Sequence, residues 1–82
     1  MPFYAYILKS TICDRRYIGS CSDIETRLKR HNSGKVRSSK AYKPYTVVYS
    51  EEFPSRSEAV KREMFFKTID GYNFLKDLGI YI

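Results

Sequence analysis

The first apolar segment of the chain occupies residues 3–9, where aromatic and aliphatic side chains follow one another without a break until Lys9. Alternate residues of a strand point to opposite faces, which places Tyr4, Tyr6 and Leu8 on one face and the other apolar residues on the second. Aromatic and β-branched side chains favour a strand here. Because both faces are apolar, we expect this strand to be buried on both sides.

A second strand-like segment lies at residues 16–20, after a polar stretch at residues 10–15. Two such segments joined by a short polar gap are typical of a β-hairpin. Gly19 interrupts the second segment, and a glycine inside a strand indicates a bulge or a place where other atoms come close.

The next segment has the pattern of a helix with a capping box, in which Ser22 is the N-cap and Glu25 reaches back to it. The sequence Asn-Ser-Gly at residues 32–34 is a stop signal, so we expect a helix over residues 23–32. Residues 35–44 have no periodicity and no acidic side chain, which predicts an exposed loop.

Residues 45–50 form a third strand-like segment, which we expect to end in residues 51–54 because Pro54 cannot donate a ladder hydrogen bond. Ser55 and Glu58 then repeat the capping-box pattern and open a second helix.

We expect that helix to continue to about Ile69 before Asp70 and Gly71 stop it, and a short final helix to occupy residues 72–78. The order ββαβαα in a chain of 82 residues predicts a single domain over residues 1–82. Its fold class is α+β, with a three-stranded sheet covered by helices.

Charge narrows the range of partners. The chain has 15 Lys and Arg against 9 Asp and Glu, a net charge of +6, which favours an anionic partner, with nucleic acid ahead of an acidic membrane surface. Residues 26–50 contain no acidic side chain, and this segment holds seven basic residues: Arg27, Lys29, Arg30, Lys35, Arg37, Lys40 and Lys43. We interpret this basic segment as a nucleic-acid-binding surface, although such charge also occurs on a merely solvated face.

Cysteine and hydropathy give weaker constraints. Cys13 and Cys21 are the only cysteines and His31 is the only histidine, too few for an ordinary Cys/His zinc site. We expect two free thiols in a reducing compartment. No apolar segment approaches the roughly 18 residues of a membrane span and no signal peptide precedes the first strand, which predicts a cytoplasmic protein.

Glu63 is the most conspicuous residue of the second helix, because at 100° per residue it falls among Ala59, Val60 and Phe66. A carboxylate beside an apolar stripe is costly to bury unless it is paired or holds a metal ion. The structural alternative is an ion pair with Lys67 at i+4.

Arg27 and His31 pose the same question on the first helix, where they share an arc with Ile24 and Leu28. A guanidinium suits phosphate oxygens and an imidazole can carry a proton. In the structural alternative, Arg27 pairs with Asp23 and His31 interacts with the helix C-terminus.

Tyr6 and Tyr17 come from neighbouring strands and could bring two phenols together. Core tyrosines are common, so the pair acquires meaning from Arg27, His31 and Glu63. Together these five side chains supply a metal ligand, a phosphate clamp and proton carriers, which is the set that a one-metal phosphodiesterase needs.

At this point the chain resembles the GIY-YIG endonuclease superfamily. The second strand contains Tyr17-Ile18-Gly19 literally, and Tyr4-Ala5-Tyr6 stands where the family has Gly-Ile-Tyr. Arg27 stands at the arginine position of the family's first helix, with His31 shortly after it, and Glu63 stands at the position of the metal-binding glutamate. The resemblance covers residues 3–76 and is to a small standalone member, similar to the nuclease domain of the excision-repair nuclease.

The resemblance implies an antiparallel sheet flanked by helices and a nuclease that hydrolyses phosphodiester bonds in DNA, branched or damaged DNA among them. It implies one divalent metal ion, usually Mg²⁺ with Mn²⁺ as the alternative, held by Glu63. Arg27 would steady the phosphate and Tyr17 would orient the water or the phosphate. A phenol is a poor base at pH 7, so the role of general base stays divided between Tyr6 and His31.

The chain departs from the family pattern at the first motif, where Tyr4 and Ala5 replace glycine and isoleucine. Asn73 is the candidate for an asparagine that many members carry after the glutamate helix, and Lys67 either contacts phosphate or pairs with Glu63. Three functions remain open: a nuclease, a nucleic-acid-binding module with little cleavage activity, and a basic protein-interaction domain. RNA remains an alternative substrate, and a homodimer or a partner protein an alternative assembly.

Overall fold

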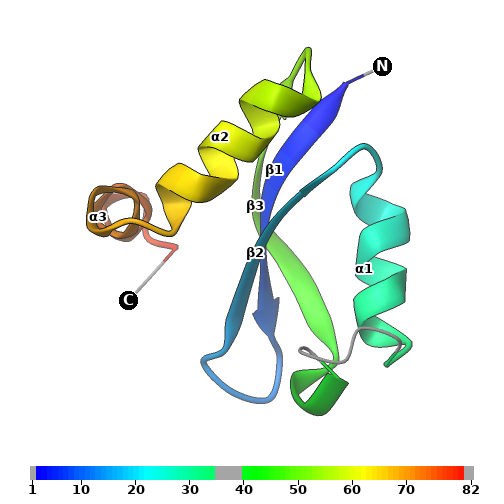
Figure 1. Cartoon of the computed structure of the whole chain (residues 1–82). Coiled ribbons are helices and arrows are strands. Elements are labelled where there is room, and N and C mark those ends of the chain that lie inside the picture. Colours follow the sequence, from blue (N-terminus) through cyan, green and yellow to red (C-terminus); the bar gives the residue numbers. More distant parts are fainter. Residues whose placement is uncertain (1, 35–39, 81–82) are drawn as a thin grey trace.

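Three strands form one antiparallel sheet with β1 (Phe3–Ser10) in the middle, flanked by β2 (Arg16–Cys21) and β3 (Tyr45–Phe53). The computed structural model describes residues 2–34 and 40–80. Its helices are α1 (Ile24–Asn32), α2 (Arg56–Phe66) and α3 (Ile69–Asp77), and a single 3₁₀ turn spans Lys40–Tyr42 (Figure 1). The predicted α+β class and the order ββαβαα are therefore confirmed.

The central strand is buried on both faces, as its sequence predicts. Ala5 and Ile7 pack with Phe66 of α2 and Leu75 of α3. Tyr6 and Leu8 point the other way and pack with Tyr45 and with apolar residues of α1. Figure 1 shows the result, with α1 on one side of the sheet and α2 and α3 on the other. None of the helices that the structure describes is long and apolar enough to cross a membrane.

Helix α1 begins one residue later than expected. Asp23, not Ser22, is the N-cap, and its carboxylate accepts hydrogen bonds from the backbone N–H of Thr26 at 3.2 Å and from its hydroxyl at 2.9 Å. Glu25 lies within 3.7 Å of the amine of Lys29 and does not take part in the cap. A carboxylate that satisfies two donors of one residue is a stronger cap than a serine hydroxyl, which explains the shift.

The predicted N-cap of α2 is confirmed, but Glu58 bonds to the hydroxyl of Ser55 where a capping box has the backbone N–H. Ser55 is the N-cap, and its Oγ accepts from the backbone N–H of Glu58 at 3.3 Å while the Glu58 carboxylate accepts from that hydroxyl at 3.2 Å.

The expected end of α2 is wrong. The helix ends at Phe66, and Thr68 caps a new helix by accepting a hydrogen bond from the N–H of Gly71 at 3.1 Å. Gly71 is therefore a buried residue inside α3 and not a stop signal, and α3 starts at Ile69 instead of residue 72. A Cβ at Gly71 would overlap the carbonyl oxygen of Phe65 and lie 2.6 Å from the Cα of Phe66, so the glycine allows α3 to pack against the end of α2.

Strand β3 continues past the expected end at Ser50 through Phe53. Glu51 and Glu52 keep their pairing with β1, opposite Ala5 and Tyr4. An acidic pair is tolerated at this point because Arg62 of α2 donates to Glu51 at 2.7 Å and Glu52 is exposed at the edge of the sheet.

The last turn of α1 is anchored in the sheet. His31 is only 1% exposed, and its ring lies 4.4 Å from that of Tyr17 and 5.9 Å from that of Tyr45. The neighbouring Asn32 accepts a hydrogen bond from the backbone N–H of Tyr45 at 2.5 Å and donates one to its carbonyl at 3.1 Å. Burial first, and then the charges of Arg27 and Arg30, lower the pKa of His31 below its ordinary value of 6.5.

We predict that Gly71→Ala lowers the free energy of unfolding by about 3 kcal/mol, because the new methyl group must displace the backbone at the end of α2. Urea unfolding followed by circular dichroism measures the effect. Asn73→Ala is the control: Asn73 is exposed two residues further along the same helix, and its substitution should change stability by no more than about 0.5 kcal/mol. A Gly71→Ala protein as stable as the wild type would show that the two helices do not approach this closely.

We predict a second effect on stability, this time through pH. Because the folded state keeps His31 neutral, the unfolded chain takes up a proton there first as the pH falls below about 6.5, and unfolding is favoured. Between pH 7.5 and 5.5 the wild type should therefore lose more stability than His31→Gln, which removes the only histidine. Denaturant unfolding at several pH values measures both slopes, and equal slopes would contradict the burial of a neutral imidazole.

Candidate active site

Glu63 occupies a half-buried position on α2 against the edge strand β2. Its two carboxylate oxygens accept hydrogen bonds from different partners, the hydroxyl of Ser20 at 2.7 Å and the amine of Lys67 at 2.9 Å. The Glu63 side chain is 21% exposed and that of Lys67 is 54% exposed. The ion pair of the structural alternative is thus present, but it is held by a solvated amine that another cation can replace.

Tyr6 lies on the opposite face of the sheet, directly across the ladder from Gly19. A Cβ at Gly19 would lie 2.7 Å from the hydroxyl oxygen of Tyr6 and 3.0 Å from the ring of Tyr17. The close approach that a glycine in this strand predicted is confirmed, and the atoms that come close are the two phenols. Their ring centroids are 6.4 Å apart.

Helix α1 brings the imidazole and a guanidinium to the same face. The His31 ring packs on Tyr17, so the three rings of Tyr6, Tyr17 and His31 form a continuous series. Arg27 lies one turn before His31 and is half-buried. Within residues 2–34 and 40–80 Arg27 forms no ion pair with Asp23, whose carboxylate caps the helix, so the structural alternative for Arg27 is wrong.

The environment of Tyr6 determines its protonation state. Burial is the largest cause that raises the pKa of its phenol, and the neighbouring Tyr17 and Cys21 and the charge of Glu63 act in the same direction. Arg27 acts against them. Tyr6 is therefore a neutral phenol at pH 7, whereas His31 is a neutral imidazole that can accept a proton.

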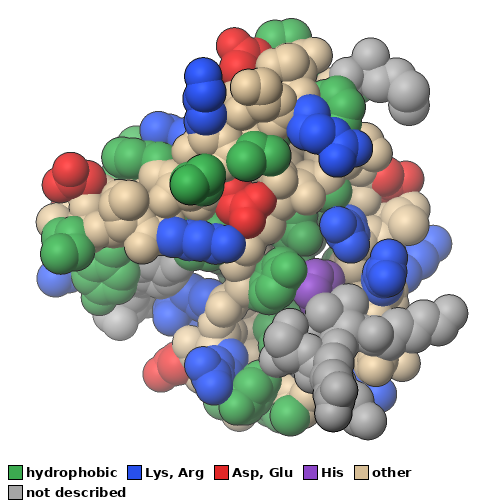
Figure 2. Space-filling view, in the orientation of Figure 1, with side chains coloured by type: hydrophobic (Ala, Val, Ile, Leu, Met, Phe, Trp, Pro, Cys, Tyr) green, Lys and Arg blue, Asp and Glu red, His purple; other side chains and the backbone are tan. Residues whose placement is uncertain are grey.

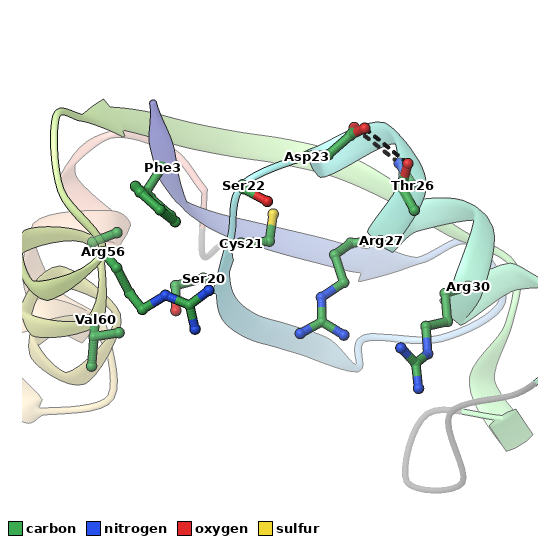
Figure 3. Close-up of a pocket in the computed structure, with 11 residues that line it drawn as sticks. Phe3, Ser20, Cys21, Ser22, Asp23, Thr26, Arg27, Arg30, Arg56 and Val60 are labelled. Atoms are coloured by element: carbon green, nitrogen blue, oxygen red, sulfur yellow. Dashed lines mark hydrogen bonds between the residues drawn. The ribbon is translucent and has the colours of Figure 1, made fainter. Parts of the chain in front are cut away.

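A pocket of about 320 Å³ opens between α1 and α2, over the end of β2. Figure 3 shows the side chains of Arg27 and Arg30 on its α1 side and those of Arg56 and Val60 on its α2 side. Ser20, which donates to Glu63, also lines it, so the pocket adjoins the carboxylate. The remaining lining residues are Phe3, Cys21, Ser22, Asp23, Thr26 and Ala59.

The predicted nucleic-acid-binding residues are only partly described. Lys29 and Lys43 are exposed, Lys40 lies in the 3₁₀ turn, and Lys35 and Arg37 fall outside the described residues. Figure 2 shows basic side chains, in blue, over α1 and α2 on the face where the histidine lies. Asn73 is exposed on α3 and does not line the pocket.

Sequence reasoning did not single out Ser20 or Arg56. Ser20 lies two residues after Ile18 on β2, so both side chains are on the face toward α2. The sequence could not reveal its hydrogen bond to Glu63, because the two residues are 43 apart in the chain. A helical stripe offered a signal for Arg56, because Arg56, Val60 and Glu63 are spaced i, i+4 and i+7 and share one face of α2.

The chemistry of the donors can be tested against a metal ion. In the part of the chain that the structure describes, no three His, Cys, Asp or Glu side chains come together as ligands. The candidate metal ligand is a single carboxylate, that of Glu63, beside the pocket. Such a site suits Mg²⁺, which keeps several water ligands and is often held by one or two carboxylates together with substrate phosphates. Cys13 and Cys21 are free thiols, as predicted.

Known proteins resemble this chain over most of its length. The profile of the GIY-YIG catalytic domain matches residues 2–71. A UPF0213 protein of Staphylococcus haemolyticus is 38% identical over 74 residues, 89% of each chain, and one of Streptococcus agalactiae is 37% identical over 68 residues, 82% of this chain and 76% of its own.

The solution NMR structure of a UPF0213 protein from Bacillus halodurans has the same fold, with a TM-score of 0.55 and 31% identity over 95% of this chain and 85% of its own. The matched range includes both tyrosine motifs, the arginine of α1 and the glutamate of α2. The chain therefore belongs to the GIY-YIG family, as a small member related to the UPF0213 proteins.

Proposed function

We propose that this protein is a metal-dependent endonuclease that hydrolyses phosphodiester bonds in DNA, with branched or damaged DNA as the form it cuts. One observation carries the proposal. Polar groups from both faces of the sheet meet at the same edge strand: Glu63 contacts β2 from the α2 side, and the series of rings contacts it from the α1 side. Both Glu63 and Arg27 act electrostatically on the Tyr6 phenol between them.

Glu63 would hold the metal ion through a carboxylate oxygen that Lys67 now occupies. When bound, Mg²⁺ supplies a Lewis acid for the phosphate and for the leaving oxygen. Lys67 is exposed enough to swing away and to contact the substrate phosphate instead. Ser20 keeps the other carboxylate oxygen, which fixes the orientation of the group.

Arg27 binds the scissile phosphate and stabilises the charge that builds up on its oxygens as water attacks phosphorus. Tyr6, as a neutral phenol, orients the attacking water by a hydrogen bond but is a poor acceptor for its proton. The neutral His31 is the better acceptor, and Tyr17, whose ring lies between those of Tyr6 and His31, orients the water or the phosphate. The sequence left the general base open between Tyr6 and His31, and we therefore assign this role to His31.

A second function has an observation in its favour. Each oxygen of Glu63 accepts a hydrogen bond from the protein, one from Ser20 and one from Lys67, as expected of a structural carboxylate. The alternative is a nucleic-acid-binding module on the same fold, in which the basic residues bind the phosphate backbone and no bond is cut.

We predict that Glu63→Gln lowers the rate of Mg²⁺-dependent cleavage of a branched DNA and of supercoiled plasmid by at least about a hundredfold, because the neutral amide cannot hold the metal. Gel assays with Mg²⁺ and with EDTA measure the rates. Glu52→Gln makes the same chemical change at an exposed position of β3 and should cleave like the wild type.

Equal cleavage by the wild type and Glu63→Gln would contradict the role of Glu63. Binding to DNA without cleavage by any of the three proteins would support the binding module instead.

We predict that Arg27→Ala and the basic-segment variants Lys35→Ala and Lys40→Ala separate chemistry from binding. Arg27→Ala should lower kcat more than it weakens DNA binding, because it acts on the charge of the transition state. Lys35→Ala and Lys40→Ala should weaken binding and reduce the salt slope by about one, with little change in kcat. Single-turnover cleavage and fluorescence anisotropy at several salt concentrations measure both, and a parallel loss of binding and kcat in Arg27→Ala would refute its transition-state role.

A further inference from the structure

The pocket between α1 and α2 is lined by three arginines, of which the proposed reaction assigns a role only to Arg27. Arg27 and Arg30 line it from α1, and Arg56 lines it from the first turn of α2. Among the lining residues that the structure describes, Asp23 is the only acidic one, and its carboxylate already accepts hydrogen bonds from Thr26. The lining therefore has a formal excess of positive charge.

These three arginines are not neutralised within the described part of the protein. In residues 2–34 and 40–80 the ion pairs join Lys9 to Asp14, Lys29 to Glu25, Arg62 to Glu51 and Lys67 to Glu63, and none involves Arg27, Arg30 or Arg56. Arginines that converge on a concave surface without a carboxylate partner are typical of a site for phosphate, whose oxygens match the planar guanidinium.

Arg56 has a defined position in spite of its exposure. Its guanidinium lies over the ring of Phe3, 5.5 Å from the centroid, and this cation–π contact holds the side chain along the wall of the pocket. Figure 3 shows the guanidinium groups of Arg56 and Arg27 directed toward the space between the two helices. The two arginines thus approach the pocket from opposite walls.

The pocket is also of the right size and composition for part of a nucleotide. Its volume of about 320 Å³ is at the lower end of the range for small-ligand sites, roughly 300–1,000 Å³. Phe3, Ala59 and Val60 give it an apolar wall, against which a sugar or base can lie while the phosphate meets the arginines.

We infer that Arg56 binds a second phosphate of the DNA strand, a neighbour of the scissile one, with Phe3 as the positioning residue that orients it. This inference rests on the proposed function for the identity of the ligand, because that proposal assigns the scissile phosphate to Arg27. The strand then crosses the end of β2 from α1 to α2. Ser20 marks the junction of the two subsites, since it lines the pocket and bonds to Glu63.

The experiment measures binding in EDTA, so its result does not depend on cleavage. A series of fluorescent branched oligonucleotides carries one uncharged methylphosphonate each, moved phosphate by phosphate through the strand near the junction. The proteins compared by anisotropy are the wild type, Arg56→Ala, Phe3→Leu and the control Lys61→Ala. Lys61 is exposed on α2 and does not line the pocket, and its loss changes the net charge equally.

Arg56→Ala should bind the unmodified oligonucleotide about tenfold more weakly than the wild type. At one methylphosphonate position the wild type should lose the same factor, whereas Arg56→Ala should lose nothing further, because its partner phosphate is already gone. Phe3→Leu should show a smaller loss confined to the same position, and Lys61→Ala should follow the wild type throughout.

The inference is overturned if Arg56→Ala binds like the wild type, or if it remains as sensitive as the wild type to every methylphosphonate. Failure of the nuclease proposal looks different: cleavage is then absent in Mg²⁺ while the position-specific effect of Arg56 persists in EDTA.

Discussion

The burial of β1 on both faces is the constraint on which the rest of the structure depends. Because Ala5 and Ile7 must pack under α2 and α3 while Tyr6 and Leu8 pack under α1, no polar group can approach through the middle of the sheet. Polar side chains from both layers can meet only at an edge. The edge strand β2 provides this place. On one face the missing side chain of Gly19 leaves room for the Tyr6 phenol, and on the other face Ser20 contacts Glu63.

This arrangement explains why the candidate site tolerates groups that are individually unfavourable. Tyr6 and His31 are almost completely buried, and each is held in its neutral form by that burial. Arg27 is half-buried and lines the pocket, and in the described part of the chain it forms no ion pair with a carboxylate. Neutral proton carriers, together with guanidinium groups that form no ion pair among the described residues, suit an anionic substrate that brings its own charge.

Local sequence patterns predicted most of the fold because they depend on near neighbours. The apolar strand at residues 3–9, the hairpin glycine and the Ser55 cap were correct for this reason. The errors came from contacts between distant segments. In the sequence Gly71 has the pattern of a helix stop, but in the structure it allows α3 to pack against the backbone of Phe65. Strand β3 extends past Ser50 because Arg62 compensates the charge of Glu51. Likewise, helical spacing and motif positions pointed to the five site residues, and the same spacing carried a signal for Arg56, whereas the role of Ser20 depends on a contact with Glu63, 43 residues away in the chain.

The central claim is that Glu63 holds a divalent ion at the edge of β2, and paramagnetic NMR with Mn²⁺ tests it most directly. Substoichiometric Mn²⁺ added to the ¹⁵N-labelled protein should broaden the amide signals of Ser20, Glu63 and Lys67 first, and those of Gly19 with them, and Glu63→Gln should abolish this pattern. Broadening that is centred on other carboxylates, or that is unchanged in Glu63→Gln, would contradict the account.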